Sequence, residues 1–115
     1  MSINRIQRVN SLIQEELGNI ILREIEFPQN TLVTITRVKT SANIFEASIL
    51  ISVLPSDKFK QVIKILNNSI YELQQLLNKR LKMRPMPRIK FMQETETISA
   101  GEIEGILEQL KKKNK

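Results

Sequence analysis

The 115-residue sequence contains no cysteine and no histidine. Their absence excludes disulfide bonds and removes the ligands that dominate zinc and redox-metal sites. The same two residue types supply the usual base and nucleophile of enzymes near neutral pH, and Asp57 is the single aspartate. The three glycines, Gly18, Gly101 and Gly105, form no phosphate-binding loop. We therefore expect a protein that is not an enzyme and that carries no metal and no cofactor.

Aromatic residues and long apolar runs are also scarce. Aromatics make up 4% of the chain, so isoleucine, leucine and valine must build the core. There is no run of about eighteen apolar residues and no secretory signal pattern, so we expect a cytoplasmic protein without membrane association. The length suits one domain, expected over residues 1–110 and followed by a basic tail at residues 111–115.

Positive charge is concentrated in one place. Eighteen Lys and Arg against twelve Asp and Glu give a net charge of +6, and residues 79–90, the basic segment, hold six basic residues and no acid. Such a local surplus makes a focused positive field, which favours a polyanionic partner such as a nucleic acid. A solvated helix end is the alternative for this segment. The lysines of the tail suit the C-terminal end of a helix.

Two segments have the periodicity of amphipathic helices. Apolar residues recur at steps of three and four over residues 3–25, and Pro28 forces the first helix to end near Glu26. The same spacing returns over residues 59–81. Residues 67–69, Asn-Asn-Ser, interrupt this second segment with side chains that compete for backbone hydrogen bonds, which predicts a kink.

Two segments between these helices have the character of strands. Residues 31–39 are rich in β-branched types and predict a strand with a bulge near Arg37. Residues 45–53 alternate between apolar and polar types and predict a half-buried strand, with Phe45 on the core side. Residues 40–43 have turn chemistry, so the two strands are expected to form an antiparallel hairpin.

The remainder of the chain predicts a connector, a strand and a helix. Two prolines make residues 83–87 a rigid extended connector that presents Arg84. Residues 88–91 alternate polar and apolar types, which places the two basic residues of this last strand on the face opposite the core. Residues 102–110 predict a C-terminal helix. The expected fold is α+β: a three-stranded sheet with helices packed on one face, in the order α-β-β-α-kinked α-β, plus the C-terminal helix.

Five stretches, by their order and spacing, carry a resemblance to a known family. They are Arg8-Val9 with Glu16-Leu17, residues 32–38, Ser41-Ala42-Asn43-Ile44 with Ala47, Ser52-Val53-Leu54, and residues 81–91. Together they resemble the bacterial ribosome-binding factor A family over residues 5–110. The resemblance implies a type II KH-like domain that binds the free 30S ribosomal subunit, promotes late 16S rRNA maturation and matters in cold growth. It implies other assembly factors and GTPases as further partners, and we expect a monomer.

The site between the two later helices departs from what the resemblance implies. KH domains clamp nucleic-acid backbone with a GxxG loop, which this sequence lacks. The Ala-x-Gly kink of the family falls here on Ser69-Ile70-Tyr71, preceded by Asn68. Tyr71 is expected to pack, and stacking on a base is the alternative.

The candidate RNA-binding residues are the basic residues of the first helix, the first strand and the basic segment. They are Arg5, Arg8, Arg37, Lys39, Lys79, Arg80, Lys82, Arg84, Arg88 and Lys90. Arg5 and Arg8 also suit the polar face of a helix, and Arg37 and Lys39 suit edge protection at the end of a strand. Two other functions stay open: a protein-interaction adaptor and a non-specific nucleic-acid-binding domain.

Overall fold

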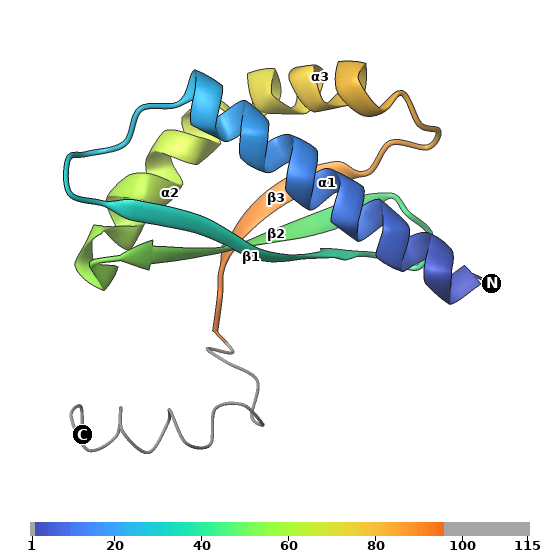
Figure 1. The fold of residues 1–115 in the computed structure, drawn as a ribbon, viewed down its shortest axis with the longest axis horizontal. Coiled ribbons are helices and arrows are strands. Elements are labelled where there is room, and N and C mark those ends of the chain that lie inside the picture. The colour runs from blue at the N-terminus through green and yellow to red at the C-terminus, as the bar shows by residue number, and fades with distance from the viewer. Residues whose placement is uncertain (1, 96–115) are drawn as a thin grey trace.

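The computed structural model describes residues 2–95, and three helices cover one side of its three-stranded sheet (Figure 1). The elements are α1 (Ser2–Glu24), β1 (Leu32–Thr40), β2 (Glu46–Leu54), the 3-10 turn η1 (Ser56–Lys58), α2 (Phe59–Asn68), α3 (Ile70–Leu81) and β3 (Arg88–Gln93). This order confirms the α+β prediction. The helix predicted at residues 102–110 and the basic tail lie outside the described residues.

The sheet combines one antiparallel and one parallel pairing. Its order is β1-β2-β3, with β1 antiparallel to β2 and β2 parallel to β3. The parallel pairing needs a crossover, which α2 and α3 provide. A register shift between Ile35 and Arg37 confirms the predicted bulge, and it turns both Thr36 and Arg37 toward the sheet face away from the helices, called here the open face.

Aliphatic side chains build the core, as predicted. Among the described residues, sixteen of the eighteen buried hydrophobic residues are Ile, Leu or Val. Ile13 and Leu17 of α1 and Ile49 and Ile51 of β2 have no exposed surface, because α1 lies across the sheet (Figure 1). Within residues 2–95, no helix is long and apolar enough to cross a membrane.

Side chains of α1 satisfy backbone groups of the edge strand β1. The Gln14 amide donates a hydrogen bond from Nε2 to the Ile35 carbonyl at 3.1 Å. Asn10 Oδ1 accepts one from the Thr40 N–H at 3.0 Å. These contacts fix α1 against β1 with polar as well as apolar interactions.

The prediction that Phe45 faces the core was wrong. Ile44 adopts a left-handed conformation with φ 58° and is buried instead, with 6% of its surface exposed, while Phe45 is 60% exposed. A β-branched residue at positive φ is strained, and the turn that imposes this conformation breaks the alternation before β2 begins at Glu46. Leu50 is buried although it lies on the open face.

Candidate nucleic-acid interface

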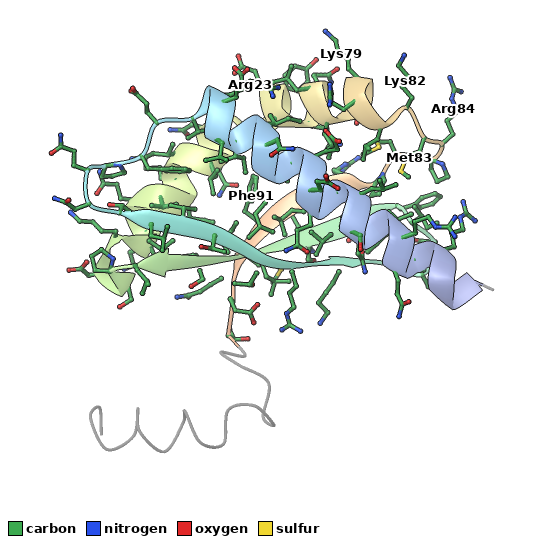
Figure 2. All side chains as sticks on the ribbon, in the orientation of Figure 1. Arg23, Lys79, Lys82, Met83, Arg84 and Phe91 are labelled. Carbon is green, nitrogen blue, oxygen red and sulfur yellow. The ribbon has the colours of Figure 1, made fainter. Side chains whose placement is uncertain are left out.

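The C-terminal end of α3 presents three cations at one edge of the molecule. Lys79, Lys82 and Arg84, called here the basic edge, are exposed, and their side chains project outward from α3 and the following connector (Figure 2). Lys82 caps α3 in a left-handed conformation, φ 47° and ψ 42°, and its N–H donates to the Asn78 carbonyl at 3.0 Å. The chain therefore turns sharply at Lys82, and the residues that follow no longer run along the axis of α3.

The prediction of an extended connector was wrong, because the chain bends at Arg84 and Pro85. The connector, which in the structure takes in residues 82–87, is fixed at its end by Gln74 of α3. Gln74 Nε2 donates to the Pro87 carbonyl at 3.1 Å, and Gln74 Oε1 accepts from the Ile89 N–H at 2.8 Å. Pro87 is fully buried, and Met86 packs partly against the core. Cations carried on such a fixed segment lose less conformational entropy when they bind phosphates.

Arg80 belongs to the basic segment but has a partner within the fold. Its Nε donates to Glu16 Oε1 of α1 at 3.0 Å, and its side chain is 59% exposed. The contact joins α1 to α3 across 64 positions of sequence. The spacing of residues along the sequence does not predict an ion pair between two positions so far apart.

The last two cations of the basic segment lie on the open face. Arg88 is paired in register with Glu46, and Lys90 with Ser48, whose other neighbour is Lys39 of β1. Lys90 Nζ lies 3.9 Å from Glu46 Oε1. The placement of Arg88 and Lys90 away from the core is as predicted. The basic segment is thus divided: Lys79, Lys82 and Arg84 lie at the basic edge, and Arg88 and Lys90 lie on the open face.

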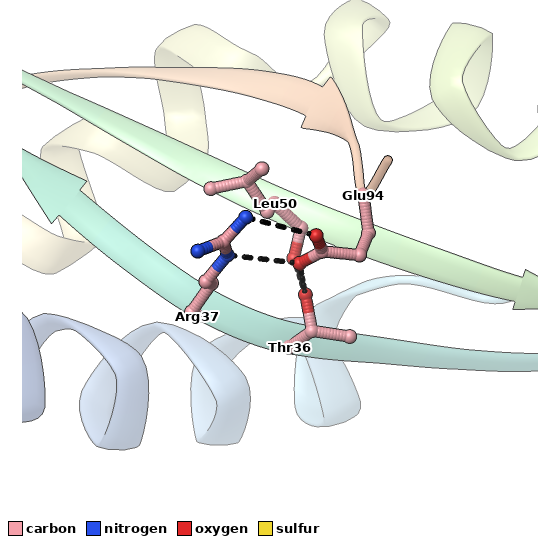
Figure 3. Close-up of polar contacts among 4 residues, drawn as sticks. All are labelled: Thr36, Arg37, Leu50 and Glu94. Atoms are coloured by element: carbon pink, nitrogen blue, oxygen red, sulfur yellow. Dashed lines mark hydrogen bonds and ion pairs between the residues drawn. The ribbon is translucent and has the colours of Figure 1, made fainter. Parts of the chain in front are cut away.

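Arg37 lies within β1, at the bulge, and not at the end of a strand. Its guanidinium forms two hydrogen bonds with the Glu94 carboxylate, at 3.1 and 3.0 Å, and Thr36 also donates to Glu94 (Figure 3). The Arg37 side chain is 37% exposed. Its charge is therefore engaged in joining β1 to the end of β3.

Arg5 and Arg8 are exposed on the first turns of α1, while Val9 beside them is buried. The structure leaves both guanidinium groups at the surface, where they remain candidates for phosphate contact. Among the described residues, no group of three or more His, Cys, Asp or Glu side chains is placed to hold a metal ion.

The predicted kink between α2 and α3 is present at Ser69, which has φ −108° and ψ 7°. Asn68 is exposed, and Ile70 packs partly against the core. Tyr71 is 73% exposed, so the expectation that it packs was wrong. The start of α3 therefore presents an aromatic ring to solvent.

A kinked helix pair that joins two parallel strands, together with an antiparallel strand and an N-terminal helix, defines a small α+β domain of the KH-like type. A sequence model described as "Ribosome-binding factor A" matches residues 5–107. A Pseudomonas paraeruginosa protein of that name, from strain DSM 24068 / PA7, is 33% identical over 108 residues, or 91% of this chain and 84% of the relative. One from Pseudomonas fluorescens strain ATCC BAA-477 / NRRL B-23932 / Pf-5 is 32% identical over 91% of this chain and 81% of its own length. The chain belongs to the ribosome-binding factor A family.

Solved structures agree with this fold. The crystal structure of ribosome-binding factor A from Thermus thermophilus has a TM-score of 0.67 at 18% identity, over 76% of this chain and 94% of the other. A homology model of the Thermus thermophilus factor, fitted into a cryo-EM map of a 30S complex with that factor, has a TM-score of 0.63 at 19% identity, over 76% and 92% of the two chains.

Proposed function

We propose that this protein is a non-catalytic assembly factor that binds the free 30S ribosomal subunit in the cytoplasm and promotes late maturation of 16S rRNA. Its family membership supports the proposal, since the similar Thermus thermophilus factor was fitted into a map of a 30S complex. The observation that carries it is the basic edge, where three exposed cations project from one end of α3 and from the connector (Figure 2).

The geometry of the basic edge suits RNA phosphates. Contacts between cations and phosphates supply affinity and set orientation, and they release condensed counterions, so binding weakens as salt rises. Gln74 holds the end of the connector that carries Arg84, through its hydrogen bonds to Pro87 and Ile89. We expect the shape of the rRNA surface to supply the specificity, as is usual for folded RNA.

Charge reversal of the basic edge tests the proposal. The triple variant Lys79→Glu, Lys82→Glu and Arg84→Glu is expected to lose cosedimentation with free 30S subunits while its circular dichroism spectrum stays native. A matched control reverses the same number of charges on η1 and α2: Lys58→Glu, Lys60→Glu and Lys64→Glu. Retained binding by the first variant, or equal loss by both, contradicts the assignment of this surface.

Competition separates an assembly factor from a general polyanion binder. Excess duplex DNA at physiological salt is expected to leave the 30S complex intact. A purely electrostatic binder has no strong preference for the subunit, so duplex DNA would displace it. In cell extract, the protein is expected to sediment with free 30S subunits and not with translating ribosomes. Recovery of protein partners without 16S rRNA after crosslinking would instead indicate an adaptor domain.

A further inference from the structure

A shallow hollow lies where the connector meets the open face. Phe45, Glu46, Met86 and Arg88 line it, and its volume is about 410 Å³. Its four side chains come from the turn before β2, the start of β2, the connector and the start of β3. This hollow is separate from the kink at Ser69, where a KH domain would clamp nucleic-acid backbone.

The backbone holds Phe45 in its exposed position. The Phe45 N–H donates to Asn43 Oδ1 at 3.0 Å, and the Phe45 carbonyl accepts from the Arg88 N–H at 2.9 Å. Ile44, at φ 58°, takes the buried place and turns Phe45 outward. The ring is therefore presented at the surface by a fixed backbone, and a ligand that stacks on it meets a preorganised partner.

The side chains of the hollow match the chemistry of an unpaired nucleobase. Proteins recognise single-stranded RNA by stacking bases on aromatic rings and by hydrogen bonds to the Watson–Crick edge. Glu46, whose side chain is 61% exposed, offers a carboxylate that accepts hydrogen bonds. Guanine presents two adjacent N–H donors on its Watson–Crick edge, which suit the two oxygens of one carboxylate. The Arg88 guanidinium supplies a donor for the neighbouring phosphate.

We propose that Phe45, Glu46, Met86 and Arg88 form a binding site for one unpaired base of RNA, with guanine preferred. The proposal deepens the proposed function and rests on it for the identity of the RNA as rRNA. Residues 82–87 join the basic edge to the hollow. An RNA strand whose phosphates contact Arg84 is therefore directed toward Phe45.

Methyl NMR tests the site directly with guanosine 5′-monophosphate as the probe. In protein labelled with 13C at the methionine methyl groups, the Met86 signal is expected to shift on addition of the nucleotide, while the signals of Met83 and Met92 stay in place. Uridine 5′-monophosphate is expected to shift Met86 less at the same concentration, and Glu46→Ala is expected to reduce that difference. No shift of Met86, or equal shifts of all methionines, overturns the proposal.

Variants test the contribution of stacking to RNA affinity. Phe45→Ala is expected to weaken binding of a fluorescein-labelled uridine octamer with one central guanosine by roughly 5- to 150-fold, and Phe45→Trp is expected to retain it. Phe45 is 60% exposed, so these variants are expected to fold. Tyr71→Ala, which removes the other exposed aromatic ring, is the matched control. Loss with Tyr71→Ala and none with Phe45→Ala would place the base at the kink and overturn the proposal.

The two proposals fail separately. If Met86 responds to the nucleotide but the protein does not cosediment with 30S subunits, the proposed function is wrong and the base site stands. The opposite result is that the protein cosediments with 30S subunits, the nucleotide does not shift the Met86 signal, and Phe45→Ala binds the octamer as tightly as the unchanged protein. In that case the base site is wrong and the proposed function stands.

Discussion

Arg37 of β1 and Glu94, the residue after β3, form a bidentate ion pair across the open face, with Nε–Oε1 at 3.1 Å and Nη2–Oε2 at 3.0 Å (Figure 3). β2 lies between the two strands, so the pair spans the full width of the sheet. The bulge makes this possible because it turns Thr36 and Arg37 to the same face, and both donate to the one carboxylate. The end of the short strand β3 is thereby held in place.

Removal of the Glu94 charge is expected to destabilise the domain. The Glu94 side chain is 8% exposed, and Glu94→Gln weakens its hydrogen bonds with Arg37 and Thr36. We expect the free energy of unfolding to fall by about 1–3 kcal/mol in urea titrations. Glu46→Gln is the control: that carboxylate is 61% exposed and 3.9 Å from Lys90, and its loss is expected to cost about 0.5 kcal/mol or less. Equal losses would contradict this role of Glu94.

Gly18→Ala is expected to stabilise the protein. Gly18 lies within α1, and a Cβ atom at this position meets nothing within 4 Å. Alanine restricts the unfolded chain and favours the helix, so the free energy of unfolding is expected to rise by about 0.4–1 kcal/mol. Thermal unfolding followed by circular dichroism measures the effect, and a lower melting temperature would contradict it.

Lys82→Gly is expected to raise stability and lower 30S affinity at the same time. Lys82 has a left-handed backbone, which glycine adopts without steric cost, so the free energy of unfolding is expected to rise by about 1 kcal/mol. The variant also removes one charge from the basic edge. Lys79→Gly removes the same charge from the last turn of α3, where the backbone is helical, and is expected to lower stability by about 0.5–1 kcal/mol. A stability change of the same sign in both variants would contradict this account.

Salt dependence is expected to distinguish Arg84 from Arg80. A cation that contacts phosphate contributes about 0.7 to the slope of log affinity against log salt concentration for single-stranded nucleic acid. Arg84→Ala is expected to reduce the slope for 30S binding by about that amount. Arg80→Ala is expected to reduce it less, because Arg80 is engaged with Glu16. Titrations over a range of salt concentrations measure both slopes, and equal reductions would argue against the distinction.

Local patterns predicted most of the secondary structure. The long first helix, the hairpin, the bulge near Arg37, the kink at Ser69 and the last strand depend on neighbouring residues, whose periodicity and backbone preferences are visible in the sequence. The class of fold followed from their order.

Contacts between distant segments were not predictable in this way. The pairs Arg37–Glu94 and Arg80–Glu16 join residues 57 and 64 positions apart, and each depends on how the strands and helices are placed together. Phe45 was assigned to the core by counting alternation, which cannot detect that Ile44 turns left-handed and takes the buried place. The hollow around Phe45 was missed for the same reason.

The contacts of Gln14 with Ile35 and of Asn10 with Thr40 have a consequence for self-association. An uncovered edge strand is a template for pairing with another chain, and such pairing leads to strand exchange and aggregation. Here side chains of α1 already use two of the backbone groups of β1. Those two groups of the β1 edge are thereby less available for pairing with a strand of a second copy.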